Sequence, residues 1–291
     1  MQRLLLLCAV GFVSLMAQMS NPDAQAALNR GVQAFKAGQY AAATTAFQEA
    51  IRLAPGGVNP RLYLATTYMS QWIPGSTAPG NEDLAVKAED MFQQVLNLDS
   101  RNTVALTSLA SLAFNQGKGT LSAARMRHFD EAERWYKNLL DAQSTDKIAL
   151  YSLGVIAWER YYPELMNARA KLGMKPETPG PLPDPALRAD LRSRFGRIVE
   201  DGISSLKRAI EVDPQYDDAM AYLNLLYRER ADYSHSAADY SLDIQRADEL
   251  VTQALEARRR KQEAGTGPAS LAPPPPPPPP GNQRIRVGGR N

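Results

Sequence analysis

The sequence contains very little histidine and cysteine. Among its 291 residues there are one cysteine, Cys8, and two histidines, His128 and His235. Neither histidine has a second histidine or a cysteine at the spacing of metal ligands, so a zinc site is not supported. We expect both histidines to lie in solvated loops and the protein to have no catalytic residues, no metal and no cofactor. An enzyme that uses a loop histidine is the alternative, and it predicts an activity that is lost on His128→Ala or His235→Ala.

An excess of charge of one sign is also absent. The 33 lysines and arginines and the 31 aspartates and glutamates give a formal net charge of +2. No long basic stripe is present in the part of the chain that is expected to fold, which argues against nucleic acid as a partner. Hydrophobic residues make up 44% of the sequence, enough for a buried core.

The first residues of the chain carry almost no charge. One basic residue, Arg3, precedes an apolar run over Leu4–Ala17. This run is shorter than the roughly 20 residues that cross a bilayer as a helix. It predicts a secretory signal peptide over residues 1–26, with cleavage after Ala26 in an Ala24-x-Ala26 pattern and Ala17 as the weaker alternative site. An uncleaved membrane anchor is the other interpretation. Either way, we expect an exported protein of the periplasm or cell envelope.

The stretch "AGQYAAATTAFQEAIRLAP", residues 37–55, predicts a helix. Ala43, Phe47, Ala50 and Leu53 recur at helical spacing until Pro55 ends the run. So narrow an apolar face cannot be buried by the helix alone. It is typical of a helix that stacks in a repeating array.

Four equal intervals along the chain support a repeat. Marker residues lie 22 positions apart from Ala43 to Ala65, from Ala88 to Ala110, from Ala132 to Gly154 and from Gly202 to Asn224. The complementary intervals vary, from 12 residues between Gly31 and Ala43 to 48 between Gly154 and Gly202. The constant interval predicts a fixed register between the second helix of one pair and the first helix of the next. The variable interval predicts insertions in the turn inside each pair, and small markers would let the paired helices approach closely.

The first unit resembles the tetratricopeptide repeat, with eight residues on the family's positions: Gly31, Gly38, Tyr40, Ala43, Phe47, Ala50, Leu53 and Pro55. The resemblance extends from residue 24 to about residue 257. It implies an all-α, right-handed superhelical solenoid of about five helix pairs over residues 27–257. The longest insertion, about residues 161–195, is expected to be an extended loop followed by a short helix at "PALRADLRSRFG".

In this family the first helices of the repeats line a concave face. The resemblance places a partner-binding groove there, formed by Phe35, Met69, Phe114, Tyr151, Val155 and Trp158. An apolar groove with aromatic side chains would bind a peptide or helix segment of a protein partner, and no small-molecule substrate is implied. The alternative is that these side chains pack against neighbouring helices or under the inserted loops.

Residues 258–291 differ in composition from the repeats. They contain the basic cluster Arg258–Lys261 and eight consecutive prolines, residues 273–280. They predict a disordered tail with a polyproline rod of about 25 Å, at roughly 3.1 Å per residue. The closing "QRIRVGG" resembles the segment that precedes the C-terminal domain of TonB-type energy transducers, which implies a bacterial envelope setting.

Two functions stay open at this point. The first is a non-enzymatic interaction scaffold of the cell envelope that binds its partner in the apolar groove. The second is a rigid spacer arm whose proline-rich, basic tail makes the functional contact, as part of an envelope or TonB-like assembly.

Overall fold

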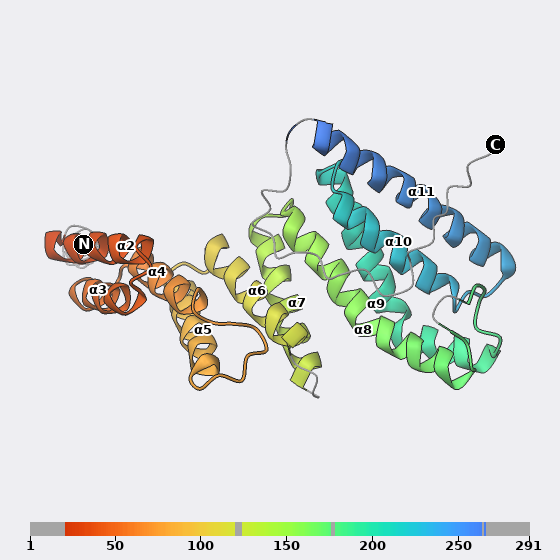
Figure 1. Ribbon diagram of the computed structural model, residues 1–291, viewed down its shortest axis with the longest axis horizontal. Coiled ribbons are helices and arrows are strands. Elements are labelled where there is room, and N and C mark those ends of the chain that lie inside the picture. Colours follow the sequence, from red (N-terminus) through yellow and green to blue (C-terminus); the bar gives the residue numbers. More distant parts are fainter. Residues whose placement is uncertain (1–20, 120–123, 176–177, 264, 266–291) are drawn as a thin grey trace, which may run out of the picture. The chain divides into compact units, whose positions relative to one another are not determined.

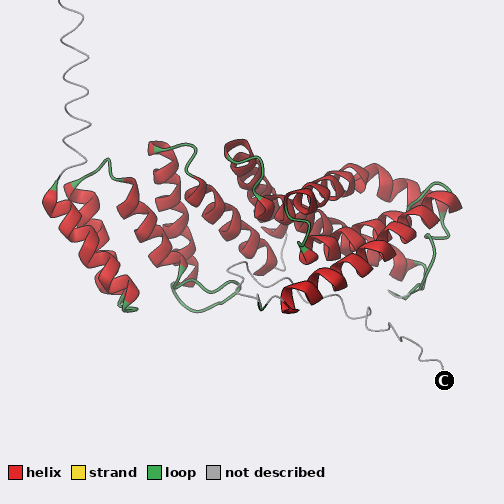
Figure 2. Ribbon diagram, turned by 90° about the horizontal axis from the view of Figure 1, so that it is seen from above, coloured by secondary structure: helices red, strands yellow, loops and turns green. Residues whose placement is uncertain are grey.

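The structure is a computed structural model that describes residues 21–119, 124–175, 178–263 and 265. Within these ranges every regular element is an α-helix (Figures 1 and 2). Residues 1–20 of the predicted signal peptide and residues 266–291 of the predicted tail lie outside the described ranges. The signal peptide, the polyproline rod and the TonB-like segment therefore stay predictions. No helix within the described ranges is long and apolar enough to cross a membrane.

The described helices form five consecutive pairs, which confirms the predicted all-α repeat. The pairs are α2 (Pro22–Lys36) with α3 (Tyr40–Leu53), α4 (Val58–Met69) with α5 (Asn81–Leu98), α6 (Thr103–Gly119) with α7 (Ala124–Ala142), α8 (Lys147–Lys171) with α9 (Pro185–Val212), and α10 (Asp217–Ala231) with α11 (Ala237–Glu263). The chain divides into two compact units, Met1–Gln143 and Ser144–Asn291. Three pairs belong to the first unit and two to the second.

Paired helices approach closely where one of them carries a glycine. A Cβ atom added at Gly31 would lie 2.4 Å from the Phe47 ring, and one added at Gly154 would lie 2.2 Å from the side chain of Leu206. Both distances are shorter than atoms tolerate. The expected role of small residues at the paired positions is thus confirmed at these two glycines.

Two adjoining hydrophobic clusters join the pairs of the first unit. Phe47 of α3 is fully buried and packs in a cluster with Ala43 and Leu64, and Phe92 of α5 is fully buried in a second cluster. Met91 packs against both clusters. Stacking therefore buries the narrow apolar face that α3 could not bury alone, as predicted for a repeat.

Inserted residues mostly lengthen helices. The second pair does have a long turn, residues 70–80, but in the fourth pair α8 has 25 residues and α9 has 28. Only residues 172–184 separate these two helices, so the prediction of an extended loop over residues 161–195 with a separate short helix is wrong. Asp184 caps α9 by accepting hydrogen bonds from two backbone N–H groups, and Pro185 occupies the first turn, where proline is favoured. No residue after this strong start interrupts the helix before Val212.

Helix α2 begins at Pro22, inside the predicted signal peptide of residues 1–26. The Asn21 side chain caps it by accepting from the backbone N–H groups of Asp23 and Ala24 at 3.0 and 3.2 Å. Asn21 also donates to the Leu53 carbonyl at 3.1 Å, and Ala24 is buried. Cleavage after Ala26 would remove this capped turn, whereas cleavage at the alternative site would leave it intact.

We predict that a chain starting at Ala27 is less stable than one starting at Asn21. It loses the N-cap, which contributes about 1 kcal/mol in other helices, together with the buried first turn. Urea unfolding of the two truncated chains measures the difference directly. Equal unfolding midpoints would show that the first turn of α2 contributes nothing to stability.

We predict that Gly154→Ala destabilises the second unit by about 1–3 kcal/mol, the usual cost of overpacking. The matched control is Gly196→Ala in the interior of α9, where a Cβ atom would meet only Arg192 Cγ at 3.4 Å. That change should be neutral or stabilising by up to about 1 kcal/mol, because glycine weakens a helix interior. Urea unfolding that ranks the two variants in the opposite order would contradict the close approach of α8 and α9.

Candidate functional site

All six predicted groove residues lie on the first helices of their pairs. In the first unit, Phe35 of α2 and Met69 of α4 are half-buried. Phe114 of α6 is only 7% exposed, and its ring centroid lies 6.0 Å from that of Phe129 on the paired helix. Phe35 and Met69 thus keep surface for a partner, whereas Phe114 is used mainly for packing within its pair.

The other three predicted groove residues lie on α8 in the second unit. Tyr151 is half-buried, while Val155 and Trp158 are 1% and 8% exposed. The side chains of Phe114, Val155 and Trp158 therefore pack against neighbouring helices, as in the alternative interpretation. Changing Phe114 and Trp158 to alanine would therefore disturb the fold. Partner binding at the six positions stays a prediction.

Five aromatic rings join α8 to α10 in the second unit, and we call them the aromatic ladder. Ring centroids are 5.3 Å apart for Tyr151 and Tyr216, 5.6 Å for Tyr151 and Tyr222, 5.7 Å for Trp158 and Tyr222, and 4.8 Å for Trp158 and Tyr162. Aromatic pairs at such distances stabilise a structure beyond the area that they bury. The ladder fixes α8 against α10.

A buried carboxyl group, that of Glu229, is hydrogen-bonded to one ring of the aromatic ladder. Trp158 Nε1 donates a hydrogen bond to Glu229 Oε1 at 2.7 Å, and Glu229 is 7% exposed. Burial raises the pKa of Glu229 well above its usual value, although the hydrogen bond from Trp158 opposes this shift. Glu229 Oε2 has no hydrogen-bond partner within the described ranges. This combination favours the protonated, neutral form of Glu229 in the folded protein.

A buried ion pair holds the turn between α8 and α9. Arg169 pairs with Asp232, and both are largely buried. Arg169 also donates to the carbonyl of Thr178, and the backbone N–H of Leu182 donates to the Asp232 carbonyl at 2.9 Å. Burial raises the pKa of Asp232 to about 6 even though Arg169 lowers it. Through Arg169 and Asp232, these contacts connect Thr178 and Leu182 of the turn to the end of α10.

We predict that Glu229→Gln reduces the loss of stability at high pH. A carboxyl group whose pKa is higher in the folded state contributes stability below its unfolded pKa, about 4.3 for glutamate, and this contribution is lost as the pH rises through the folded value. Glutamine cannot ionise, and its carbonyl oxygen can still accept from Trp158. Urea unfolding at pH 5 and pH 8 should therefore show a smaller decrease for the variant than for the wild type.

The exposed Glu211 of α9 provides a matched control for this experiment. Glu211→Gln makes the same chemical change at a solvated position and should leave the pH response of the wild type in place. If Glu229→Gln has the same pH response as Glu211→Gln, Glu229 is ionised in the folded protein.

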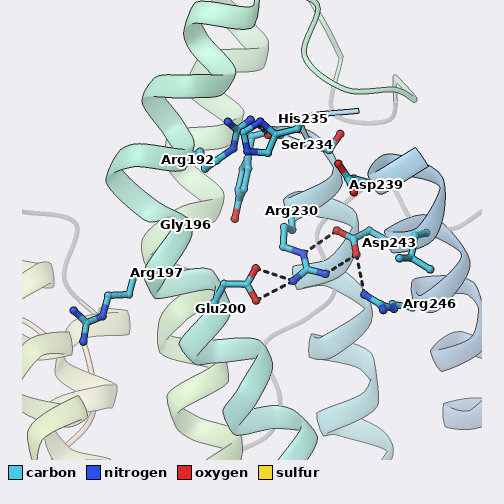
Figure 3. Close-up of a pocket in the computed structure, with 12 residues that line it drawn as sticks. Arg192, Gly196, Arg197, Glu200, Arg230, Ser234, His235, Asp239, Asp243 and Arg246 are labelled. Carbon is cyan, nitrogen blue, oxygen red and sulfur yellow. Dashed lines mark hydrogen bonds and ion pairs between the residues drawn. The ribbon is translucent and has the colours of Figure 1, made fainter. Parts of the chain in front are cut away.

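A cavity of about 550 Å³ lies among α9, α10 and α11 in the second unit (Figure 3). Its charged and polar lining comes from all three helices and from the turn before α11: Arg192, Arg197, Glu200, Arg230, Tyr233, Ser234, His235, Asp239, Asp243 and Arg246. Leu242 adds an apolar side chain that is 45% exposed. The cavity is thus a charged site with a small apolar wall, unlike the predicted groove.

Arg230 lines this cavity and lies between two carboxylates. Its guanidinium donates to both carboxylate oxygens of Asp243, at 2.8 and 2.5 Å, and to both of Glu200, at 2.7 and 2.9 Å (Figure 3). Burial alone would lower the pKa of Arg230. The hydrogen bonds and negative charges of Asp243 and Glu200 outweigh this effect, so the pKa is raised. The hydroxyl of Tyr233, which also lines the cavity, is buried without a hydrogen-bond partner among the described residues.

The two histidines lie in different surroundings. His128 is in helix α7, so its predicted loop position is wrong: the inserted residues there continue the helix. His235 lies in the turn between α10 and α11, as expected, and lines the cavity. Within the described ranges, no group of three or more histidine, cysteine, aspartate or glutamate side chains could hold a metal ion.

Neither Glu229 nor the cavity is predicted from the sequence. Tyr151, Trp158 and Tyr162 do recur at helical spacing, so the α8 side of the aromatic ladder carries a signal in the sequence. Glu229 lies in a polar run, "YRERAD", that predicts an exposed face. The cavity depends on side chains from three helices, which no local pattern brings together.

The model of the tetratricopeptide repeat matches this chain twice, over residues 17–58 and 120–161. The two matched segments are identified as tetratricopeptide repeats. Outside them, the described chain continues the same arrangement of consecutive helix pairs. A comparison with curated proteins finds no match to the chain.

Solved structures with a similar fold include several MamA proteins. The MamA RS-1 ArsTM double mutant is 16% identical, with a TM-score of 0.51 over 84% of this chain and 98% of its own. MamA 41-end from Desulfovibrio magneticus RS-1 is 15% identical, with a TM-score of 0.49 over 83% and 98%. YrrB, described as a TPR protein with an unusual peptide-binding site, is 12% identical, with a TM-score of 0.44 over 80% and 90%. The similarity to the MamA RS-1 ArsTM double mutant shows a shared fold and nothing about function.

Proposed function

We propose that this protein is a non-enzymatic interaction scaffold of the cell envelope, and that it binds a peptide or helix segment of a partner protein on the first helices of its repeats. Tetratricopeptide repeats present their first helices as an extended binding surface, which supports a protein as the partner. The observation that carries the proposal is the half-burial of apolar side chains on those helices.

Half-buried apolar residues recur on the first helices of both units. In the first unit they are Leu28, Val32 and Phe35 of α2 and Leu62 and Met69 of α4, and in the second unit Tyr151 of α8. Such side chains are positioned by their packing and still offer apolar surface, so a partner can bind them at a small cost in side-chain entropy.

Export of the protein is part of the same proposal. The apolar run over Leu4–Ala17 precedes the capped start of α2 at Asn21, so removal of a signal peptide at the alternative site, Ala17, would be compatible with a folded first repeat. The envelope setting is supported by this segment and by the closing "QRIRVGG".

We predict that the triple variant Phe35→Ser/Met69→Ser/Tyr151→Ser loses its partner in capture from an envelope fraction. Removing apolar anchors commonly costs 1 kcal/mol or more each, so binding should weaken at least about tenfold. The control carries the same three changes at exposed apolar residues of second helices: Val86→Ser/Leu98→Ser/Leu255→Ser. Equal loss in both variants would contradict a site on the first helices.

Two further arms make the capture experiment decisive. A photoreactive phenylalanine analogue at Phe35 keeps the fold and should cross-link the partner, whereas the same analogue at Leu98 should not. A chain that ends after Ala264 tests the spacer-arm alternative. If this truncation alone abolishes capture, the tail makes the functional contact and the proposed groove is wrong.

A further inference from the structure

We propose that the cavity among α9, α10 and α11 is a second binding site, specific for a short acidic peptide segment. The inference rests on the proposed function only in taking a protein segment as the ligand. It concerns the side of the second unit where α10 ends and α11 begins, and none of the predicted groove residues lines it. Four arginines and one histidine line the cavity against three carboxylates.

All three carboxylates already have partners. Both oxygens of Glu200 and of Asp243 accept hydrogen bonds from Arg230, and Asp239 accepts from the Ser236 hydroxyl at 2.8 Å. Arg230 is therefore fixed in position, and its one positive charge is outweighed by the two negative charges of Glu200 and Asp243. The four arginines and three carboxylates leave the lining with a formal net charge of +1, and the positive charge that a ligand meets is local, at the arginines other than Arg230.

Arg192 and Arg246 keep N–H donors for a ligand. Each guanidinium carries five N–H donors, and Arg192 uses one of its terminal nitrogens to donate to the Tyr233 carbonyl. Arg246 Nη1 lies 3.6 Å from Asp243 Oδ1, and the side chain of Arg246 is 43% exposed. Figure 3 shows Arg192 and His235 on one side of Arg230, Arg246 on the other side, and Arg197 directed away from it. The site thus has two separate positive ends.

The shape and the lining select a peptide over a single ion. A guanidinium fork matches a carboxylate through two parallel hydrogen bonds, and two such groups on either side of Arg230 suit two acidic side chains of one segment. Leu242 is 45% exposed at the cavity and offers apolar contact to another residue of the same segment. A volume of about 550 Å³ exceeds what one inorganic anion needs.

Fluorescence anisotropy on the full chain tests this site. The probe is a fluorescein-labelled hexapeptide of alternating glutamate and leucine, and its counterpart with glutamine in place of glutamate lacks the charge. We expect the acidic probe alone to bind, more weakly as salt is raised. Arg192→Gln and Arg246→Gln should each weaken binding about fivefold to tenfold, and the double variant about fiftyfold.

The control is Arg259→Gln, which makes the same charge change on an exposed residue of α11 outside the cavity. It should leave the affinity within about twofold of the wild type, since a solvated charge contributes little. Thermal unfolding by circular dichroism verifies that each variant is folded, and Arg246→Gln tests the site even if Arg192→Gln disturbs the Tyr233 carbonyl.

Three results would overturn the inference. The first is equal binding of the acidic and the glutamine peptide, and the second is an equal loss in Arg259→Gln and Arg246→Gln. The third is loss of acidic-peptide binding in the first-helix triple variant with no loss in the cavity variants. Partner capture by the first helices is measured separately, so these results leave the proposed function intact.

Discussion

The structure depends on close contact between the two helices of each pair. Where Gly31 faces Phe47 and Gly154 faces Leu206, a side chain on the first helix would occupy the space of the facing one. The fully buried Phe47 and Leu206 fill the gap that each glycine leaves. Because this contact sets the distance between the paired helices, it also decides which apolar residues remain at the surface of the first helices.

The second unit also contains buried polar groups between its helices. Glu229 behind the aromatic ladder and Asp232 beside Arg169 both have raised pKa values because burial disfavours their charged forms. Such groups contribute little net stability compared with apolar residues of the same volume, but they require specific partners. The partner of Glu229 is Trp158 and the partner of Asp232 is Arg169, both of α8, so these groups specify how α8 packs against α10.

The repeat could be predicted from the sequence because its signal is local and recurs. Small residues, a helical apolar face and a terminating proline lie within one helix, as in residues 37–55. The lengths of α8 and α9 could not be predicted, since the proline-rich stretch "KPETPGPLPDP" indicates a turn without showing where the helices on either side of it end. Trp158 is a plausible groove residue by position, and only the contacts with Tyr222 and Glu229 reveal its burial.

The lengthening of helices in this fold leaves the stacked segments in place. Helix α8 has 25 residues and α10 has 15, which at about 1.5 Å per residue leaves α8 about 15 Å longer. The interval of 22 residues that keeps neighbouring repeats in register lies outside this extra length. The far ends of the helices can therefore differ in length from one pair to the next without a change in the register of the repeats.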